Sequence, residues 1–232
     1  MKSFGIWYDA RDNHLAEGQR RRQTMMKRIL CIGDSNTWGY DPRSWFGSQY
    51  PANVRWTGLL EQTGWTVFNY GQNGASIPGK AAFPTVSRLI KSRLPVDVVT
   101  VMLGSNDLLE GITAEKVEER MGNFLTCVSE AAPEAKLLLI APPVMKLGAW
   151  VPSMQLIEES SRLTGLYQEL AAAAGSEFAD AEIWGIDLTF DGVHFSPEGH
   201  RAFARGAGRN AGETLKQQAY HSGRSIQEKQ GL

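Results

Sequence analysis

The chain has 232 residues, of which 42% are hydrophobic and 21% are charged, and its formal net charge is −1. Its length suits one α/β domain, and its composition is that of an ordinary globular protein. So small a net charge excludes the whole-chain field that gathers nucleic acid or anionic membranes, and we expect no nucleic-acid partner. No apolar run is long enough to cross a bilayer, so we expect no stable membrane association.

Residues 1–25 are expected to form a disordered leader ahead of the folded domain. They lack the apolar segment of a signal peptide, and their three consecutive arginines come late, at residues 20–22. Since Lys27 opens directly into a strand-like run, Met26 is a candidate for the natural start. N-terminal sequencing of the native protein tests this, and finding residues 1–25 on it would contradict it.

The chain contains two cysteines, Cys31 and Cys127, each inside an apolar run. Two isolated thiols do not make a disulfide framework, so we expect a reducing compartment and a cytoplasmic location.

From Lys27 onward, apolar runs alternate with segments of helical periodicity. The runs predict strands at residues 28–32, 65–70, 96–103, 135–141 and 177–181. The intervening patterns predict helices at 53–62 with Asn53 as cap, at 81–94, at 113–131, at 154–174, and from Ser196-Pro197 onward. This order predicts a three-layer α/β/α, flavodoxin-like fold with a five-stranded parallel sheet. The domain is expected to cover residues 26–217, followed by a mobile polar tail at 218–232.

In a parallel sheet covered by helices, the functional site lies beyond the carboxyl ends of the strands. That rule selects four loops, at residues 33–39, 69–74, 104–107 and 191–195. In the first, Ser35 lies at a strand-to-helix turn, where unpaired N–H groups attract negative charge. In the second, Gly74 lets a backbone N–H approach a ligand closely. Each feature alone is also explained by a helix cap or a turn.

The other two loops contribute an amide and a carboxylate–imidazole pair. Asn106 follows the most apolar strand, and its side chain can donate to an oxyanion. Asp191 precedes His194 by three residues and can accept the Nδ1–H, which fixes the tautomer of the ring. His200, in the last helix, is expected to be structural. A metal site of both histidines with Asp191 is conceivable, but the spacing matches no common zinc site.

The four loops, taken in order, resemble the conserved blocks of the SGNH (GDSL-like) hydrolases. The blocks are Gly-Asp-Ser, Asn-x-Gly-x-x-Gly, Gly-x-Asn-Asp and Asp-x-x-His, and the resemblance covers about residues 27–215. One position departs from the pattern: Asn36 follows the serine where the namesake motif has Leu. Because this position is not a reacting group, we expect it to affect pocket shape rather than chemistry.

The resemblance implies a serine esterase whose triad is Ser35, Asp191 and His194. The family's oxyanion hole maps to the N–H groups of Ser35 and Gly74 and the side chain of Asn106, and no metal or cofactor is required. Within the family, residues 29–39, 54–58 and 101–104 are similar to the arylesterase/acyltransferase branch. That similarity implies short-chain acyl or aryl esters as substrates, with acetyl-carbohydrate esters, lysophospholipids or thioesters as alternatives.

The sequence gives weaker signals for the substrate pocket and for the oligomeric state. Trp38 and Trp45 after the nucleophile, with Met145 and Trp150 after the fourth strand, are candidates for an apolar acyl or aryl pocket. Loop packing or a subunit contact would explain these side chains equally well. The sequence is compatible with a homo-oligomer and does not fix its size.

There are three alternatives to the serine esterase, and each meets an objection in the sequence. Residues 74–81 almost spell a P-loop, but Ala81 stands where Ser or Thr should hold Mg²⁺. An α/β-hydrolase would need a Gly-x-Ser-x-Gly elbow, and the chain has none. A non-catalytic binding module on the same fold would need a distortion of the site that the sequence does not reveal.

Overall fold

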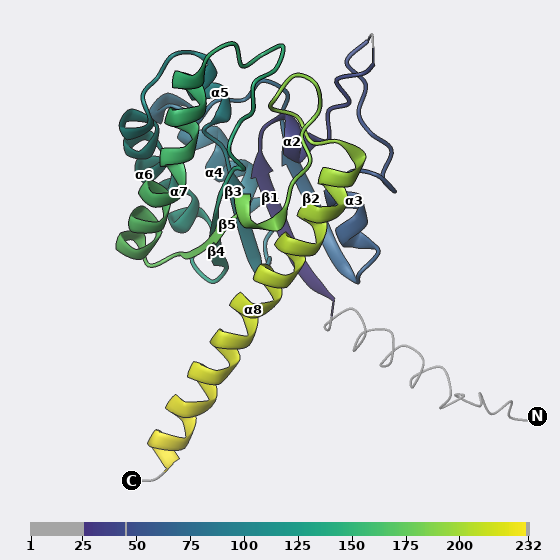
Figure 1. Ribbon diagram of the computed structural model, residues 1–232. Coiled ribbons are helices and arrows are strands. Elements are labelled where there is room, and N and C mark those ends of the chain that lie inside the picture. Colours follow the sequence, from purple (N-terminus) through teal and green to yellow (C-terminus); the bar gives the residue numbers. More distant parts are fainter. Residues whose placement is uncertain (1–25, 45, 231–232) are drawn as a thin grey trace, which may run out of the picture.

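The computed structural model describes residues 26–44 and 46–230, and it shows five parallel strands between two layers of helices (Figure 1). The strands are β1 (Lys27–Gly33), β2 (Trp65–Gly71), β3 (Val98–Met102), β4 (Lys136–Ala141) and β5 (Glu177–Asp180). They lie in the order β2-β1-β3-β4-β5, and all pairs are parallel. The predicted α/β/α fold is therefore confirmed. The predicted leader, residues 1–25, lies outside the described residues.

The helices divide between the two faces of the sheet. The longer ones are α3 (Trp56–Glu61), α4 (Phe83–Lys91), α6 (Ala114–Ala131), α7 (Met154–Ala174) and α8 (Pro197–Gln230). Helices α4, α6 and α7 enclose one hydrophobic core, and α3 and α8 enclose the other. Two short helices, α2 (Ser35–Trp38) and α5 (Ser105–Leu109), follow β1 and β3 directly. The chain therefore turns into a helix at the two strand ends that carry Ser35 and Asn106.

Two of the predicted helices begin or end elsewhere in the structure. The helix expected from Asn53 begins only at Trp56, because the N–H groups of Val54 and Arg55 bond to the Pro51 carbonyl in a preceding turn. The helix expected at 81–94 is a 3₁₀ turn, η1 (Lys80–Ala82), followed by α4. By contrast, the predicted 154–174 helix has the bounds of α7, and Ser196 caps α8 by accepting the Gly199 N–H at 3.1 Å.

The last helix continues through residues 218–230, where the sequence predicts a polar tail (Figure 1). Its backbone there is helical, and the predicted division into a domain at 26–217 and a mobile tail at 218–232 stays a prediction. A second short 3₁₀ turn, η2 (Glu182–Trp184), precedes the loop that leads into α8. No helix among the described residues has both the length and the apolar character needed to span a membrane.

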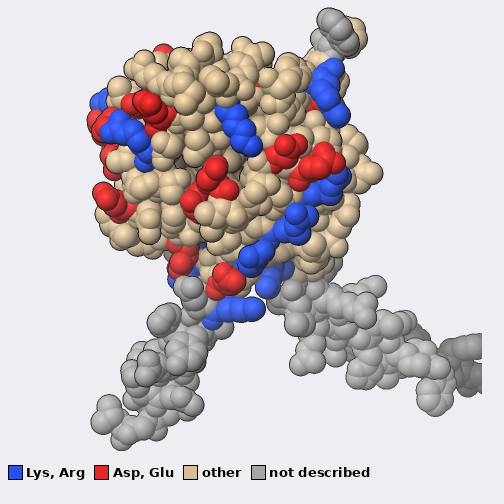
Figure 2. All heavy atoms as spheres, viewed as in Figure 1, with Lys and Arg blue, Asp and Glu red and all other residues tan. Residues whose placement is uncertain are grey.

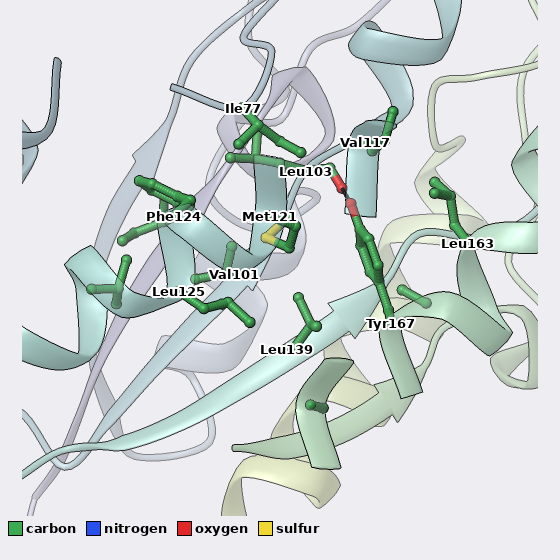
Figure 3. Packing of buried hydrophobic residues seen from close by; sticks show 14 of the residues in the cluster. Ile77, Val101, Leu103, Val117, Met121, Phe124, Leu125, Leu139, Leu163 and Tyr167 are labelled. Carbon is green, nitrogen blue, oxygen red and sulfur yellow. Dashed lines mark hydrogen bonds between the residues drawn. The ribbon is translucent and has the colours of Figure 1, made fainter. Parts of the chain in front are cut away.

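The core beneath the end of β3 supports the Asn106 loop. The Tyr167 hydroxyl of α7 donates to the Leu103 carbonyl at 3.0 Å, inside a cluster of apolar side chains (Figure 3). Gly104 follows with a φ of +118°, and a Cβ there would lie 2.6 Å from the Tyr167 oxygen. Only glycine accepts both the conformation and the close approach. A buried hydroxyl and a glycine thus fix the point from which α5 and Asn106 begin.

Candidate active site

Ser35 is the first residue of α2, at the carboxyl end of β1. Asp34 caps this short helix by accepting the Asn36 N–H at 2.9 Å, and Gly39 ends it in the left-handed conformation. The Ser35 N–H makes no hydrogen bond to any described residue. Because the first N–H groups of a helix lack an intrahelical partner, it is an available donor beside the hydroxyl.

The structure brings Ser35, His194 and Asp191 into one hydrogen-bonded chain, as predicted. The Ser35 Oγ lies 2.9 Å from His194 Nε2, and His194 Nδ1 lies 2.8 Å from Asp191 Oδ2. All three are shielded from solvent, with exposed fractions of 5%, 1% and 0%. The imidazole therefore has a hydroxyl at one nitrogen and a carboxylate at the other, which is the arrangement of a general base.

The Asp191 carboxylate is held in its ionised form. Burial alone raises its pKa, but hydrogen bonds from the His194 ring and from the N–H groups of His194 and Val193 outweigh burial and lower the pKa to about 2. An ionised partner is what the Nδ1–H of His194 requires, since a carboxylate accepts and does not donate. The neighbouring Asp34 behaves in the opposite way, because burial raises its pKa to about 6.

Two aromatic rings pack on the His194 imidazole. The Tyr40 centroid lies 4.7 Å from it at 53°, and the Trp150 centroid lies 4.8 Å from it at 81°. Trp150 was predicted in the pocket and here covers the ring of the proposed base. Tyr40 was missed, because no sequence pattern connects it to a histidine 154 positions away.

The other predicted pocket residues lie in different environments. Met145 is almost completely buried in the hydrophobic core, so it offers little surface to a substrate. Trp38 is half-buried at the end of α2, and Trp45 lies outside the described residues.

An apolar cavity of about 380 Å³ lies below the loop that follows β2, with the α4 and α6 side chains as its far wall. That volume is in the range of small-molecule sites. Of the predicted pocket residues that the structure describes, Trp38, Met145 and Trp150 do not line it, whereas Gly33 and Ala75, the sequence neighbours of Asp34 and Gly74, do. The sequence offered no signal for this cavity, because its walls come from β1, β2, the loops after β2 and β3, η1, α4 and α6.

The remaining predicted donors lie on the loops after β2 and β3. Gly74 has a φ of +68°, and its N–H makes no hydrogen bond to a described residue. The Asn106 amide donates to the Ala75 carbonyl at 2.9 Å, which joins its loop to the residue after Gly74. An amide nitrogen carries two hydrogens, so one stays available.

Asp107 fixes the loop that follows Gly74. Its carboxylate is completely buried, accepts the Ile77 N–H at 2.9 Å and pairs with Arg120 at 2.8 Å. These contacts also bear on the P-loop alternative. A phosphate cradle needs free backbone N–H groups, and that of Ile77 is already bonded to a carboxylate.

The expectation that Asn36 affects pocket shape stays a prediction. Its side chain is 4% exposed and bonds to the backbone on both sides of His194. The residue that departs from the family motif is therefore in contact with the segment of the proposed base. Sequence reasoning missed this contact because residues 36 and 194 are far apart in the chain.

His200 lies on α8 behind the site, as predicted for a structural residue. It is completely buried, accepts the Trp56 N–H at Nδ1 over 3.4 Å, and packs between the Tyr50 and Phe195 rings. No group of three or more His, Cys, Asp or Glu side chains able to hold a metal occurs among the described residues. Burial lowers the pKa of His200 to about 3, so its ring is neutral at physiological pH.

Replacing His200 by Asn is expected to flatten the acid side of the stability profile. The folded-state pKa lies below the unfolded value of 6.5, so the folded protein binds fewer protons and loses stability as pH falls below about 6.5. Between pH 7 and 4.5 this loss is about 2–3 kcal/mol for one histidine, and the variant should lack it. Urea unfolding of both proteins at several pH values measures the difference.

That comparison isolates His200, since Asp34 titrates in the opposite sense in both proteins. The raised pKa of Asp34 adds stability as pH falls through 6, and this contribution cancels between wild type and variant. Parallel stability curves for the two proteins would show that His200 is already solvated or protonated in the fold.

Comparison with known proteins agrees with this fold. The sequence pattern of the GDSL-like Lipase/Acylhydrolase family matches residues 31–202. A GDSL lipase of Mycobacterium tuberculosis (strain ATCC 25618 / H37Rv) is 29% identical over 189 residues, which cover 76% of this chain and 78% of the lipase.

Solved structures of esterases also resemble this chain. The inhibitor-bound aryl esterase of M. smegmatis is 26% identical with a TM-score of 0.70, and the match covers 81% of this chain and 99% of that one. A carbohydrate acetylesterase from Sinorhizobium meliloti is 28% identical with a TM-score of 0.66, over 81% and 99% of the two chains. Since the family pattern spans most of the chain and the fold agrees, the chain belongs to the GDSL-like lipase/acylhydrolase family and is a carboxylic ester hydrolase.

Proposed function

We propose that this enzyme is a serine esterase that hydrolyses short-chain acyl and aryl esters through an acyl-enzyme. The observation that carries the proposal is the hydrogen-bonded chain from Ser35 Oγ through His194 to Asp191, at 2.9 and 2.8 Å. Such a chain activates a hydroxyl that would otherwise be a weak nucleophile at neutral pH.

In the proposed mechanism, His194 Nε2 removes the Ser35 proton as Oγ attacks the ester carbonyl. The carbonyl oxygen becomes an oxyanion, which accepts hydrogen bonds from the Ser35 N–H, the Gly74 N–H and the Asn106 amide. His194 then donates its proton to the departing alcohol, and the acyl group stays on Ser35. Water, activated by the same imidazole, releases the acid, and an acceptor alcohol in its place would complete an acyl transfer.

The surroundings of the site support a small, uncharged substrate. Leu147, Trp150 and Phe190 are exposed on the two loops that flank His194, and these loops are joined by hydrogen bonds such as that from the Trp150 N–H to the Asp191 carbonyl. In the face shown, the end of the molecule at which α2 and α5 lie has few charged side chains (Figures 1 and 2). Apolar rims of this kind favour acyl or aryl groups over charged ligands.

A panel of esters tests this substrate class. We expect kcat/KM for p-nitrophenyl esters to be highest at two to four acyl carbons and to fall at least about tenfold by twelve carbons, because a long chain outgrows a small-molecule site. Phenyl acetate should be hydrolysed as well, with Ser35→Ala as the blank. A preference for acetylated sugars would favour the carbohydrate esterase alternative, which the structural match to the Sinorhizobium meliloti acetylesterase also supports. A preference for long acyl chains or acyl thioesters would favour the lysophospholipase/thioesterase alternative.

The partners and the location of the enzyme stay as predicted from the sequence. A small-molecule ester is the expected partner, with no nucleic acid and no stable membrane association. A cytoplasmic location is expected for the same reasons as before, and both cysteines are free and buried in the structure.

Replacing Asn106 by Ala is expected to lower kcat by about 100- to 1,000-fold, or about 3–4 kcal/mol, with a smaller change in KM. The loss should fall on kcat because the oxyanion exists only in the transition state. Steady-state kinetics on p-nitrophenyl acetate measures it, with Asn123→Ala on the exposed face of α6 as the matched control. A kcat within threefold of wild type would remove Asn106 from the oxyanion hole.

A further inference from the structure

One buried polar side chain next to the nucleophile has no role in the mechanism above. Asn36 follows Ser35 in α2 and uses each of its polar groups. Its N–H donates to Asp34 Oδ1 at 2.9 Å, and its carbonyl accepts the Trp56 indole N–H at 3.0 Å. Its side-chain amide donates to the Val193 carbonyl at 3.1 Å and accepts the Phe195 N–H at 2.9 Å.

Both side-chain bonds end on residues that flank His194. Val193 and Phe195 precede and follow the histidine, so one planar amide holds the backbone on either side of it. These two residues lie 157 and 159 positions from Asn36 in the sequence. The amide therefore joins the nucleophile segment to the base segment, which meet only in the folded protein.

The other hydrogen bonds of this histidine segment tie it to its own neighbours or to the loop after β4, as in the bond from the Trp150 N–H to the Asp191 carbonyl. Asp191 holds the His194 ring and N–H from three residues upstream, and the Thr189 N–H donates to the His194 carbonyl at 2.8 Å. In the described part of the chain, hydrogen bonds between residues 34–39 and 191–196 come from Asn36 and from the Ser35–His194 pair itself. Without Asn36, no other hydrogen bond between these two described segments would help to keep Ser35 Oγ and His194 Nε2 within hydrogen-bond distance.

We infer that Asn36 is a positioning residue, whose amide holds His194 Nε2 in line with Ser35 Oγ for proton transfer. The inference rests on the proposed serine-esterase function. Proton transfer requires the two atoms within hydrogen-bond reach, and a misplacement of about 1 Å costs on the order of 100-fold in rate. Asn36 itself touches neither substrate nor the reacting atoms.

Asn36→Leu tests the inference, because leucine has the same branched shape and number of side-chain non-hydrogen atoms and forms neither bond. We expect kcat on p-nitrophenyl acetate to fall about 10- to 100-fold, while KM changes less than about threefold. The labelling rate with a fluorophosphonate should fall in parallel, since it depends on the same activated serine. Ile90→Ala, a core variant in α4 outside the site, controls for destabilisation alone and should keep wild-type kcat below its melting temperature.

Asn36→Asp gives a readout that a purely structural role would not produce. A protonated carboxyl donates to the Val193 carbonyl and accepts from the Phe195 N–H as the amide does, whereas an ionised one faces that carbonyl with a negative charge. Asp34 and Asp191 nearby oppose ionisation, and the His194 ring and the more distant His200 are the other titratable groups around the position. We expect the ratio of variant to wild-type kcat/KM to be highest at low pH and to fall as pH rises.

The two variants, measured beside Ser35→Ala, separate the possible failures. If Ser35→Ala keeps wild-type activity, the proposed function itself is wrong. If Ser35→Ala is inactive and folded Asn36→Leu retains kcat within twofold of wild type, only the positioning role is wrong. If Asn36→Leu does not fold, a pH-independent activity ratio for Asn36→Asp overturns the inference, and a falling ratio supports it.

Discussion

Replacing Ser35 by Ala is expected to lower kcat/KM for p-nitrophenyl acetate by at least about 10⁴-fold. The reason is the loss of the nucleophile: no acyl-enzyme can form, and the residual rate comes from binding and oxyanion stabilisation alone. The fold should be kept, because among the described residues the Ser35 hydroxyl bonds only to the His194 ring, while the backbone of α2 is held by Asp34 and Gly39. Steady-state kinetics gives the rate, and circular dichroism with thermal unfolding checks the fold.

Covalent labelling sharpens this result. A fluorophosphonate should modify wild type once, at Ser35, and peptide mass spectrometry should find no label in Ser35→Ala. Ser161→Ala is the matched control, since Ser161 is exposed on α7 and its hydroxyl donates to the Glu158 carbonyl of its own helix. Labelling of the Ser35→Ala protein at another serine, with activity within tenfold of wild type, would contradict the assignment of the nucleophile.

The sequence was sufficient for the sheet because strand signals here are strong and local. β3 is buried at every residue, and its run, apolar except for Thr100, predicts a strand independently of the surrounding sequence. The start of α3 was predicted three residues early, because the turn at Pro51 competes with the capping tendency of Asn53. Boundaries of this kind depend on which acceptor an N–H finds, and periodicity does not carry that information.

The reacting groups of the candidate site were predictable for a topological reason. Ser35, Gly74 and Asn106 follow neighbouring parallel strands, so the order of the sheet brings them to one edge. His194 lies on a loop rather than at a strand end, and its place was inferred from the Asp-x-x-His spacing. That spacing allows the 2.8 Å hydrogen bond to Asp191 within one short segment.

The groups that hold the reacting residues were not predictable. Asn36 and Tyr40 act on His194 through contacts between segments more than 150 positions apart, and each would satisfy a local turn or helix equally well. Met145, predicted in the pocket, packs in the core instead, because an apolar side chain after a strand fits either place. Sequence spacing thus identifies the reacting groups, whereas the residues that hold them in position are brought together only by tertiary packing.

Replacing Asp191 by Asn is expected to lower kcat/KM by about 10³- to 10⁴-fold with the geometry of the site largely kept. Asn can still accept the N–H groups of Val193 and His194 at Oδ1, where Asp191 accepts both at 2.9 Å. Its other side-chain group is an N–H₂ that donates, so it selects the His194 tautomer with the proton on Nε2. That tautomer cannot accept the Ser35 proton, and the neutral amide cannot stabilise the imidazolium that forms.

Rates per active site separate a loss of catalysis in Asp191→Asn from a loss of folded protein. The low pKa of Asp191, about 2, means that its contribution to stability is present above the unfolded value of 3.8 and is lost as pH falls through 2. At pH 7 the variant should therefore be less stable as well as slower, so rates are compared per labelled active site. Asp187→Asn makes the same charge change at an exposed position of the same loop and should keep wild-type kcat/KM. If Asp191→Asn retained more than a tenth of wild-type kcat/KM per labelled site, the carboxylate would not be the partner that orients His194.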